Sequence, residues 1–177
     1  NNYFILIKQL TFRALKTSDI EAVLKIYNYH INNGFANFEE KPFLYNDFFD
    51  LCQSITNAKL PFIVCNINKK IVGFAYLNNF RNKSGYRYSF ENSIYVDNEF
   101  TKKGIGSNLL EKLITVSSKN SKIKNIIAVI GGKNPEASIR IHKKNGFVII
   151  GTLKNIGFKK KEWLDAIYMQ KILNEKK

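Results

Sequence analysis

The stretch "TKKGIGSNLLEKL" (101–113), which follows the apolar run "NSIYV" (92–96), decides how the fold is interpreted. Apolar residues at helical spacing predict a helix over 104–119, so Gly104 and Gly106 stand where a strand gives way to a helix. The N-terminus of a helix presents unpaired N–H groups and a partial positive charge, which together suit a phosphate group. Close packing of the strand against the helix explains the two glycines equally well, and the turn alone leaves both interpretations open.

Two well-known phosphate loops do not match this turn. A P-loop ends in Gly-Lys-Ser or Gly-Lys-Thr, and the turn has neither ending. A dinucleotide-binding turn has a third glycine and a later acidic residue, and these are also missing. A phosphate at this turn would therefore belong to another class of ligand.

The rest of the chain predicts one domain over 1–177 in which helices cover both faces of a mixed sheet. We expect Ser18 with Glu21 to form a capping box at the first helix, and Asn46 to cap the second. A lysine-rich segment, "GFKKKEW", is expected to link the last two strands. The expected strands are 10–15, 61–67, 70–80, 91–96, 125–131, 147–153 and 165–173, and the expected helices are 17–32, 46–55, 104–119 and 135–146.

Composition limits the class of protein. The 177 residues are 45% hydrophobic, which allows a substantial core, and no apolar run reaches the length of a membrane span. The start, "NNYFILIKQL", lacks a cleavage site, so we expect no signal peptide. Cys52 and Cys65 have no metal-ligand spacing, so we expect reduced core residues, a cytoplasmic protein and no metal.

The formal net charge of +14 has several explanations. It could attract nucleic acid, an acidic membrane or a phosphorylated ligand. The lysines are spread along the chain without an arginine-rich tract, which favours a compositional origin. We therefore expect neither a nucleic-acid partner nor a membrane partner.

A second segment, "NPEASIRIHKKNGF" (134–147), makes the glycine turn specific. In this order and spacing, the two segments resemble the core motifs of the GCN5-related N-acetyltransferases (GNAT family). The resemblance implies a twisted, mostly antiparallel mixed sheet, with the glycine loop on the pyrophosphate of acetyl-CoA and the second helix along its pantetheine arm. The matching residues of the second motif are Asn134, Ala137, Ile141, His142, Gly146 and Phe147. The family loop usually reads Arg-Gly-Arg/Lys-Gly-φ-Gly, so Thr101 and Lys102 depart from it.

A narrower resemblance covers residues 11–173. The stretches "IYNYHINNGFANFEEKP", "FRNKSGYRYSFENSIYV", "IRIHKKNGF" and "GFKKKEWLDAIYMQ" are similar to the phosphinothricin and methionine sulfone acetyltransferase branch. It implies acetylation of the α-amine of a small amino-acid analogue by acetyl-CoA. It also implies a homodimer that brings the tryptophan loop of one chain near the other's site. A different amine, such as a polyamine, a peptide N-terminus or an aminoglycoside, stays open, as does a basic nucleic-acid-binding protein without a recognisable motif.

The resemblance assigns roles to individual residues, each with a structural alternative. Glu91 would be the base, if an apolar site raises its pKa, or else a solvated strand-end carboxylate. His142 stands where many relatives have a tyrosine that protonates the departing sulfur, although helix histidines are often structural. The N–H of Val96 would polarise the thioester carbonyl. The remaining acetyl-CoA residues would be Ile94, Tyr95, Lys102, Lys103, Gly104, Ile105, Gly106, Ser107, Asn134 and Ser138.

The substrate residues would be Arg81, Tyr86 and Arg87, before Glu91, and Phe35 and Phe38, after the first helix. A guanidinium pairs well with the carboxylate of an amino acid, although both arginines could lie in a solvated loop. The two phenylalanines could equally belong to the core.

Overall fold

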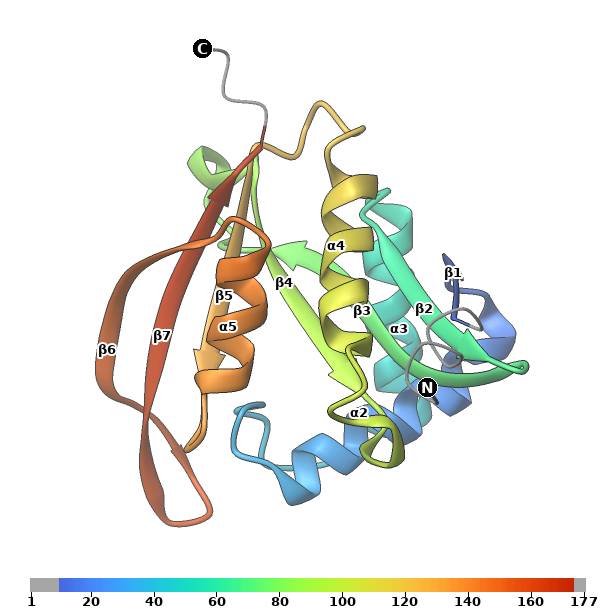
Figure 1. Ribbon diagram of the computed structural model, residues 1–177, viewed down its shortest axis with the longest axis horizontal. Coiled ribbons are helices and arrows are strands. Elements are labelled where there is room, and N and C mark those ends of the chain that lie inside the picture. The colour runs from blue at the N-terminus through green and yellow to red at the C-terminus, as the bar shows by residue number, and fades with distance from the viewer. Residues whose placement is uncertain (1–9, 174–177) are drawn as a thin grey trace.

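The computed structural model describes residues 10–173, so the expectation about a signal peptide lies outside the described residues. One seven-stranded sheet organises them in the order β1-β2-β3-β4-β5-β7-β6 (Figure 1). All neighbouring strands are antiparallel except β4 and β5, which confirms the mixed, mostly antiparallel sheet. The strands are β1 (Thr11–Ala14), β2 (Phe62–Ile67), β3 (Lys70–Asn79), β4 (Ser89–Val96), β5 (Asn125–Gly131), β6 (Val148–Lys159) and β7 (Glu162–Ile172). The helices are α2 (Ile20–Asn33), α3 (Tyr45–Asn57), α4 (Ile105–Ser117) and α5 (Glu136–Lys144), with short 3₁₀ turns η1 (Thr17–Asp19), η2 (Ser84–Tyr86) and η3 (Asn98–Phe100).

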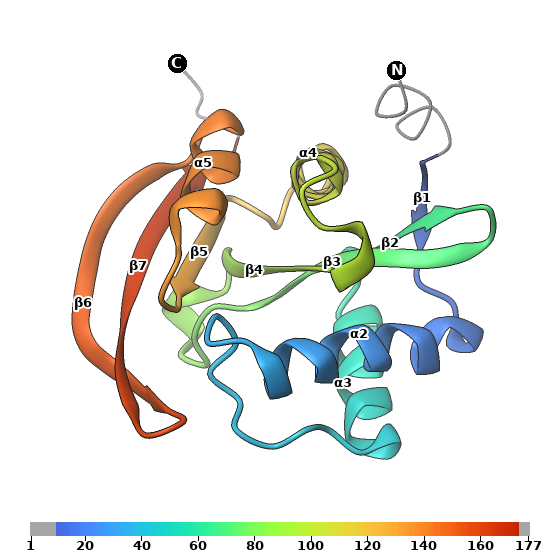
Figure 2. The same ribbon diagram turned by 60° about the horizontal axis from the view of Figure 1, so that its bottom comes forward.

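Helices cover both faces of the sheet, as expected. In Figure 2, α4 and α5 lie on one side of the strands and α2 and α3 on the other. Strands β2 and β3 are buried along most of their length because they are covered on both faces. None of the helices within residues 10–173 is long and apolar enough to cross a membrane.

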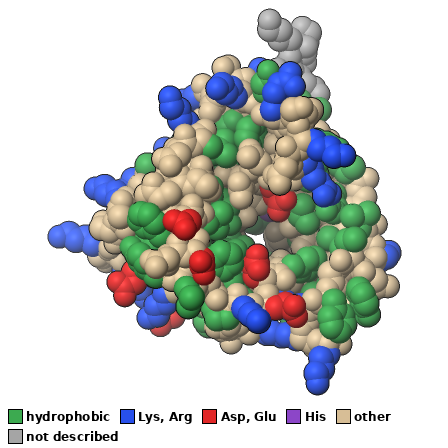
Figure 3. Space-filling model, turned by 180° about the vertical axis from the view of Figure 1, so that it is seen from behind, with side chains coloured by type: hydrophobic (Ala, Val, Ile, Leu, Met, Phe, Trp, Pro, Cys, Tyr) green, Lys and Arg blue, Asp and Glu red, His purple; other side chains and the backbone are tan. Residues whose placement is uncertain are grey.

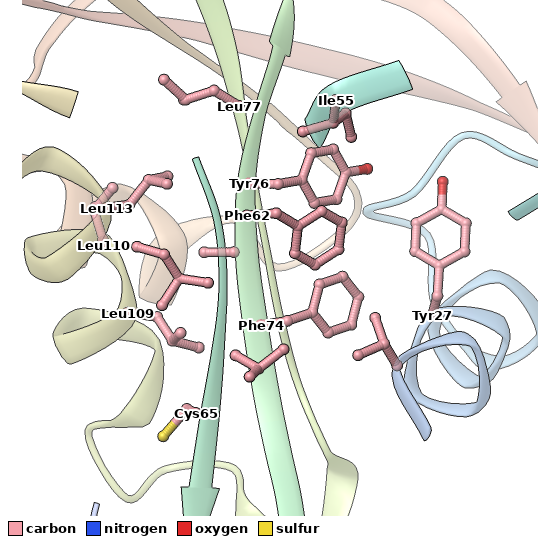
Figure 4. Close-up of a cluster of buried hydrophobic side chains, with 14 of the residues drawn as sticks. Tyr27, Ile55, Phe62, Cys65, Phe74, Tyr76, Leu77, Leu109, Leu110 and Leu113 are labelled. Carbon is pink, nitrogen blue, oxygen red and sulfur yellow. The ribbon is translucent and has the colours of Figure 1, made fainter. Parts of the chain in front are cut away.

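The core has one layer on each face of the sheet. The rings of Phe62 and Phe74 stack 5.8 Å apart on the α2 face. Figure 4 shows leucines of α4 on the opposite side of the same strands. Cys52 and Cys65 are buried free thiols, and burial raises the pKa of each to about 12. They are core residues, as expected.

Strands β4 and β5 separate soon after they meet. They pair in parallel only over Ser89–Glu91 and Asn125–Ile127. Beyond Glu91, β4 continues beside β3, and β5 continues beside β7. A gap therefore opens in the sheet immediately after Glu91.

Both predicted helix caps are wrong. The carboxylate of Asp19, rather than Ser18, accepts the N–H of Lys16 at 2.8 Å, and it also accepts a hydrogen bond from Arg13 at 2.9 Å. The Arg13 bond lowers the pKa of Asp19, so this carboxylate stays ionised where β1 passes into α2. Helix α3 begins at Tyr45 and follows Leu44, without a side-chain cap from Asn46.

The final hairpin is longer than predicted. "GFKKKEW" lies mostly inside strands β6 and β7, and the turn is made by Lys160 and Lys161 with φ of 50° and 64°. Tight hairpin turns with two positive φ values usually carry Asn or Gly. Because lysine is unusual in such turns, the sequence did not predict a tight turn at Lys160 and Lys161.

Candidate functional site

A cavity of about 520 Å³ lies at the gap between β4 and β5 and is lined by residues from both faces of the sheet. Its volume is in the range of small-molecule sites. The surface in Figure 3 is hollowed near its centre, with acidic side chains around the hollow. The lining comprises Tyr27, Ala36, Asn37, Phe38, Glu39, Tyr76, Asn78, Asn79, Glu91, Asn92, Ser93, Ile94, Tyr95, Ala128, Val129, Ile130, Gly131, Asn134, Pro135, Ser138 and His142.

Glu91 is the last β4 residue before the gap. Its side chain shares the α2 face with Ser93 and Tyr95, because alternate residues of a strand point the same way. Burial raises the pKa of Glu91, and the charge of Arg81 opposes that rise in part. Within residues 10–173 the carboxylate makes neither a hydrogen bond nor an ion pair, which leaves it open to a ligand.

A polar network around Asn37 forms one wall of the cavity. The side chain of Asn37 donates to Tyr95 Oη at 3.1 Å and accepts the N–H of Glu39 at 2.8 Å. Its backbone carbonyl accepts from Lys159 Nζ at 2.6 Å, although Lys159 is only 2% exposed. Burial raises the pKa of Tyr95 and also that of Tyr27, so both phenols keep their protons. This wall therefore offers neutral hydrogen-bonding groups in a fixed arrangement.

His142 lies on the other face of the sheet, on α5, with both ring nitrogens occupied. Nδ1 lies 2.7 Å from the carbonyl of Ser138, and Nε2 lies 3.0 Å from Nδ2 of Asn92. Burial lowers the pKa of His142, so the ring is neutral at pH 7. The Ser138 carbonyl can only accept, so the proton is on Nδ1 and Nε2 accepts from the amide.

The glycine turn forms the N-terminus of α4, as predicted. Gly104 has φ of 75°, in the left-handed region that favours glycine. A Cβ on Gly106 would stand 3.7 Å from Ile141 and Val96, which is ordinary contact. Packing therefore does not require glycine at 106. This favours the other interpretation of the turn, in which glycine lets the backbone come close to a ligand. The N–H groups of the first turn precede the first intrahelical bond, from Asn108 to Gly104.

The two lysines before the turn differ in conformation. Lys102 is exposed with φ of 60°, at a position where the family loop has glycine. Lys103 bends back, donating to the carbonyl of Glu99 at 3.0 Å and lying over the ring of Phe100. Lys102 is thus the freer of the two charges.

The backbone next to this turn is also directed into the gap. Asp97 N donates to Val72 O at 2.9 Å. In an antiparallel ladder the backbone groups of alternate residues point to the same neighbour, so those of Val96 and Ile94 point away from β3. The ring of His30 bonds the carbonyl of Val96 through Nε2 at 2.7 Å. It fixes the end of the strand.

The predicted substrate residues divide into two groups. Phe38 lines the cavity and is wedged between β5 and β6, since a Cβ on Gly131 or Gly157 would stand 2.5 Å from its ring. Phe35 lies outside the lining, beneath the ammonium groups of Lys133 and Lys160.

Arg81 and Arg87 are exposed and lie outside the cavity lining, as does Tyr86. Arg81 lies over Phe80, and Arg87 lies over Tyr88 and donates to the carbonyl of Ser84. The charge of Arg81 still reaches Glu91. Lysine and arginine are missing from the cavity lining, so in the described chain a carboxylate clamp has no cation in place.

The cavity brings together seven of the predicted residues, and the glycine turn lies next to it through Val96. Those seven are Phe38, Glu91, Ile94, Tyr95, Asn134, Ser138 and His142. Sequence reasoning missed several polar residues of the cavity lining, which are Asn37, Glu39, Asn78, Asn79, Asn92, Ser93, Tyr27 and Tyr76. Among them, only Asn92 and Ser93 could have been found from the sequence, because they directly follow the predicted catalytic residue Glu91.

A second hollow, of about 950 Å³, lies between α2 and the β2–β3 turn. Lys70 bridges Asp97 and Glu99 there, so these three charges already pair with one another. Residues 10–173 contain no group of three or more His, Cys, Asp or Glu side chains that could hold a metal. The gap between β4 and β5 is therefore the candidate active site.

Comparison with known proteins gives consistent matches. The family described as "Acetyltransferase (GNAT) domain" matches residues 12–168. A phosphinothricin N-acetyltransferase of Alcaligenes faecalis is 34% identical over 164 residues, which cover 93% of this chain and 83% of that protein. An L-methionine sulfoximine/L-methionine sulfone acetyltransferase of Salmonella typhimurium is 29% identical, covering 94% of this chain and 96% of its own. The crystal structure of a GNAT superfamily phosphinothricin acetyltransferase from Sinorhizobium meliloti, in complex with acetyl-CoA, superposes with a TM-score of 0.88 at 34% identity, covering 93% and 89% of the two chains.

Proposed function

The chain belongs to the GNAT acetyltransferase family and is an N-acetyltransferase, and from this premise we propose that acetyl-CoA donates an acetyl group to the α-amine of a small amino-acid analogue. We propose substrates of the phosphinothricin and methionine sulfoximine or sulfone type, for which the named relatives are the support. The observation that carries the proposal is the cavity at the β4–β5 gap, because residues from both faces of the sheet line this one space.

We assign the amine to the α2 face, beside Glu91. An ammonium must lose a proton before it can attack, and a carboxylate with a raised pKa is a better proton acceptor at neutral pH. Glu91 takes one proton from the ammonium, and the free amine nitrogen attacks the thioester carbon. The C–S bond then breaks, the sulfur leaves as thiolate, and the second proton released from the nitrogen neutralises the thiolate. Tyr95 and Asn37 form the wall that orients the substrate.

We assign acetyl-CoA to the α4–α5 face. The first turn of α4 offers N–H groups to the pyrophosphate, with Lys102 as the nearby free charge. The backbone of Ile94 and Val96 is available to the pantetheine arm, and the Val96 N–H to the thioester carbonyl. We also assign Asn134 and Ser138, which line the cavity on the α5 side, to the acetyl-CoA site.

A second candidate substrate has an observation in its favour. Glu39 and Glu91 line the cavity, and the lining contains neither lysine nor arginine. An acid-lined site suits a cationic amine such as a polyamine. The carboxylate of an amino acid would instead need Arg81, or a residue of a second chain.

A homodimer and a cytoplasmic location are further parts of the proposal. Strand β6 is the last strand of the sheet, and its exposed apolar side chains support a partner chain there. Two free cysteine thiols support a reducing compartment. We propose no nucleic-acid partner, and a salt-dependent shift assay with DNA and RNA tests this against the alternative of a basic binding protein.

An acetylation screen, followed through the released thiol, tests the substrate. The set pairs phosphinothricin, methionine sulfoximine and methionine sulfone with their decarboxylated amines and with diamines. We expect the amino acids to be preferred over the decarboxylated amines. The reverse preference would establish the second candidate. A melting temperature unchanged by millimolar acetyl-CoA would reject the cofactor, since a ligand at about 100 times Kd adds about 2.7 kcal/mol of stability.

A further inference from the structure

Asn92 is the first β4 residue inside the gap and is buried where the strands separate. It follows Glu91 directly, so the two side chains point to opposite faces of the sheet. Asn92 is 8% exposed and lines the cavity beside Ser138 and His142. At this level of the sheet, the α2 face therefore presents the carboxylate of Glu91, and the α4–α5 face presents the amide of Asn92.

The hydrogen bonds of the pair fix which way this amide is turned. Since the proton of His142 is held on Nδ1 by the Ser138 carbonyl, Nε2 can only accept. The group of Asn92 that lies 3.0 Å from Nε2 must then be its Nδ2. The histidine has no proton directed at the gap.

The other end of the amide is left without a partner. Asn92 Oδ1 is buried and accepts no hydrogen bond from residues 10–173. An unsatisfied buried acceptor costs about 1–3 kcal/mol, so such atoms call for an explanation. Asn66 Oδ1 is also unsatisfied, but Asn66 is at a bulge of β2 and lines no described cavity. Only Asn92 combines an unsatisfied acceptor with the candidate site.

We propose that Asn92 Oδ1 accepts a hydrogen bond from an amide N–H of the pantetheine arm of acetyl-CoA, and that His142 acts by holding Asn92 in this orientation rather than by exchanging a proton. This assignment rests on the proposed function. Asn92 becomes a binding residue for the acyl donor, and His142 becomes a positioning residue.

Calorimetric titration with two ligands tests the binding role. Coenzyme A contains the arm, whereas adenosine 3′,5′-bisphosphate contains only the nucleotide end. Asn92→Leu should weaken coenzyme A binding about two- to tenfold, the range of one net hydrogen bond, and leave the bisphosphate unchanged. Asn66→Leu is the matched control and should change neither ligand.

The outcomes separate this assignment from the proposed function. Equal affinity of Asn92→Leu and wild type for coenzyme A would overturn it, as would equal losses for both ligands or a rise in KM for the amine alone. A wild-type protein that binds neither acetyl-CoA nor coenzyme A would reject the proposed function itself.

A second variant tests the role of His142. Glutamine offers an acceptor oxygen to Asn92 but does not titrate. His142→Gln should therefore keep the pH profile of kcat and most of the coenzyme A affinity. Loss of one limb of that profile would overturn the positioning role, because it would show that the imidazole exchanges a proton.

Discussion

The burial of Glu91 has opposite consequences for catalysis and for stability. In the folded protein the pKa of Glu91 is raised, so folding favours its protonated form. As pH rises from the unfolded pKa through the folded pKa, the native state loses stability relative to the unfolded state. The ionised carboxylate is therefore a stability penalty that the proposed role of Glu91 as the base requires.

We predict that Glu91→Gln lowers kcat/KM by about 10²–10⁴-fold at pH 7 and raises the free energy of unfolding of the ligand-free protein. The activity loss should shrink as pH rises, because more of the amine is then already neutral. Urea unfolding should show the stability gain at pH 7 and its disappearance below the unfolded pKa. Near-normal activity at pH 7 would remove Glu91 as the base, and a loss independent of pH would indicate a role in positioning the substrate.

Lys102 offers a test of backbone strain. Its φ of 60° lies in the left-handed region, which costs a residue with a Cβ about 1–2 kcal/mol and glycine almost nothing. After allowance for the greater freedom of glycine in the unfolded chain, Lys102→Gly should stabilise the protein by about 1 kcal/mol. Lys103→Gly is the control, since Lys103 lacks a positive φ and bonds Glu99. Denaturant unfolding of both variants should show changes of opposite sign.

Candidate site residues could be predicted where they belong to a short sequence motif. They could not be predicted where only the tertiary fold brings them to the cavity. Glu91, Gly104 and His142 were identified through the resemblance of short segments to family motifs, and the structure puts them at or beside one gap. Asn37 belongs to the wall only because the loop after α2 folds against the end of β5, which no local pattern records. The predicted arginines failed to reach the cavity lining because their loop keeps them on neighbouring aromatic rings.

At the scale of elements, the junction between β1 and α2 depends on Asp19. We predict that Asp19→Ala lowers the free energy of unfolding by about 1.5–3 kcal/mol, because it removes hydrogen bonds between charged groups from a largely buried carboxylate. The loss should shrink as pH falls through the lowered pKa of Asp19. Ser18→Ala and Glu21→Ala are the controls and should have little effect. A large effect in either control would restore the predicted capping box.

The order and type of the elements were predictable, whereas their ends were less so. Helix α4 and the buried strand β5 have strong apolar patterns, and both lie where expected. The β6–β7 hairpin was shortened in the prediction because Lys160 and Lys161 give no turn signal. Parallel pairing of β4 and β5 over so few residues depends on tertiary packing and had no sequence signature.

At the scale of the whole molecule, β6 is exposed along most of its length at the open end of the sheet. Its exposed apolar side chains include Val148, Ile150, Leu153, Ile156 and Phe158, and Trp163 of β7 is 65% exposed. We predict a dimer through this surface at micromolar concentration. Ile156→Lys should produce monomers in sedimentation analysis, whereas Leu44→Lys, at an exposed leucine outside β6, should not. A wild-type protein that sediments as a monomer would contradict this prediction.

The β6–β7 hairpin, which presents this exposed apolar surface, also contacts the cavity wall formed by the loop after α2. Lys159 fixes the carbonyl of Asn37, and Phe38 is wedged against Gly157. Movement of β6 should therefore displace the loop after α2 that carries Asn37 and Phe38 of the cavity lining. If a partner chain steadies the hairpin, turnover per subunit should depend on the enzyme concentration in the assay. It should fall on dilution even in the wild-type protein, whose cavity residues are all unchanged.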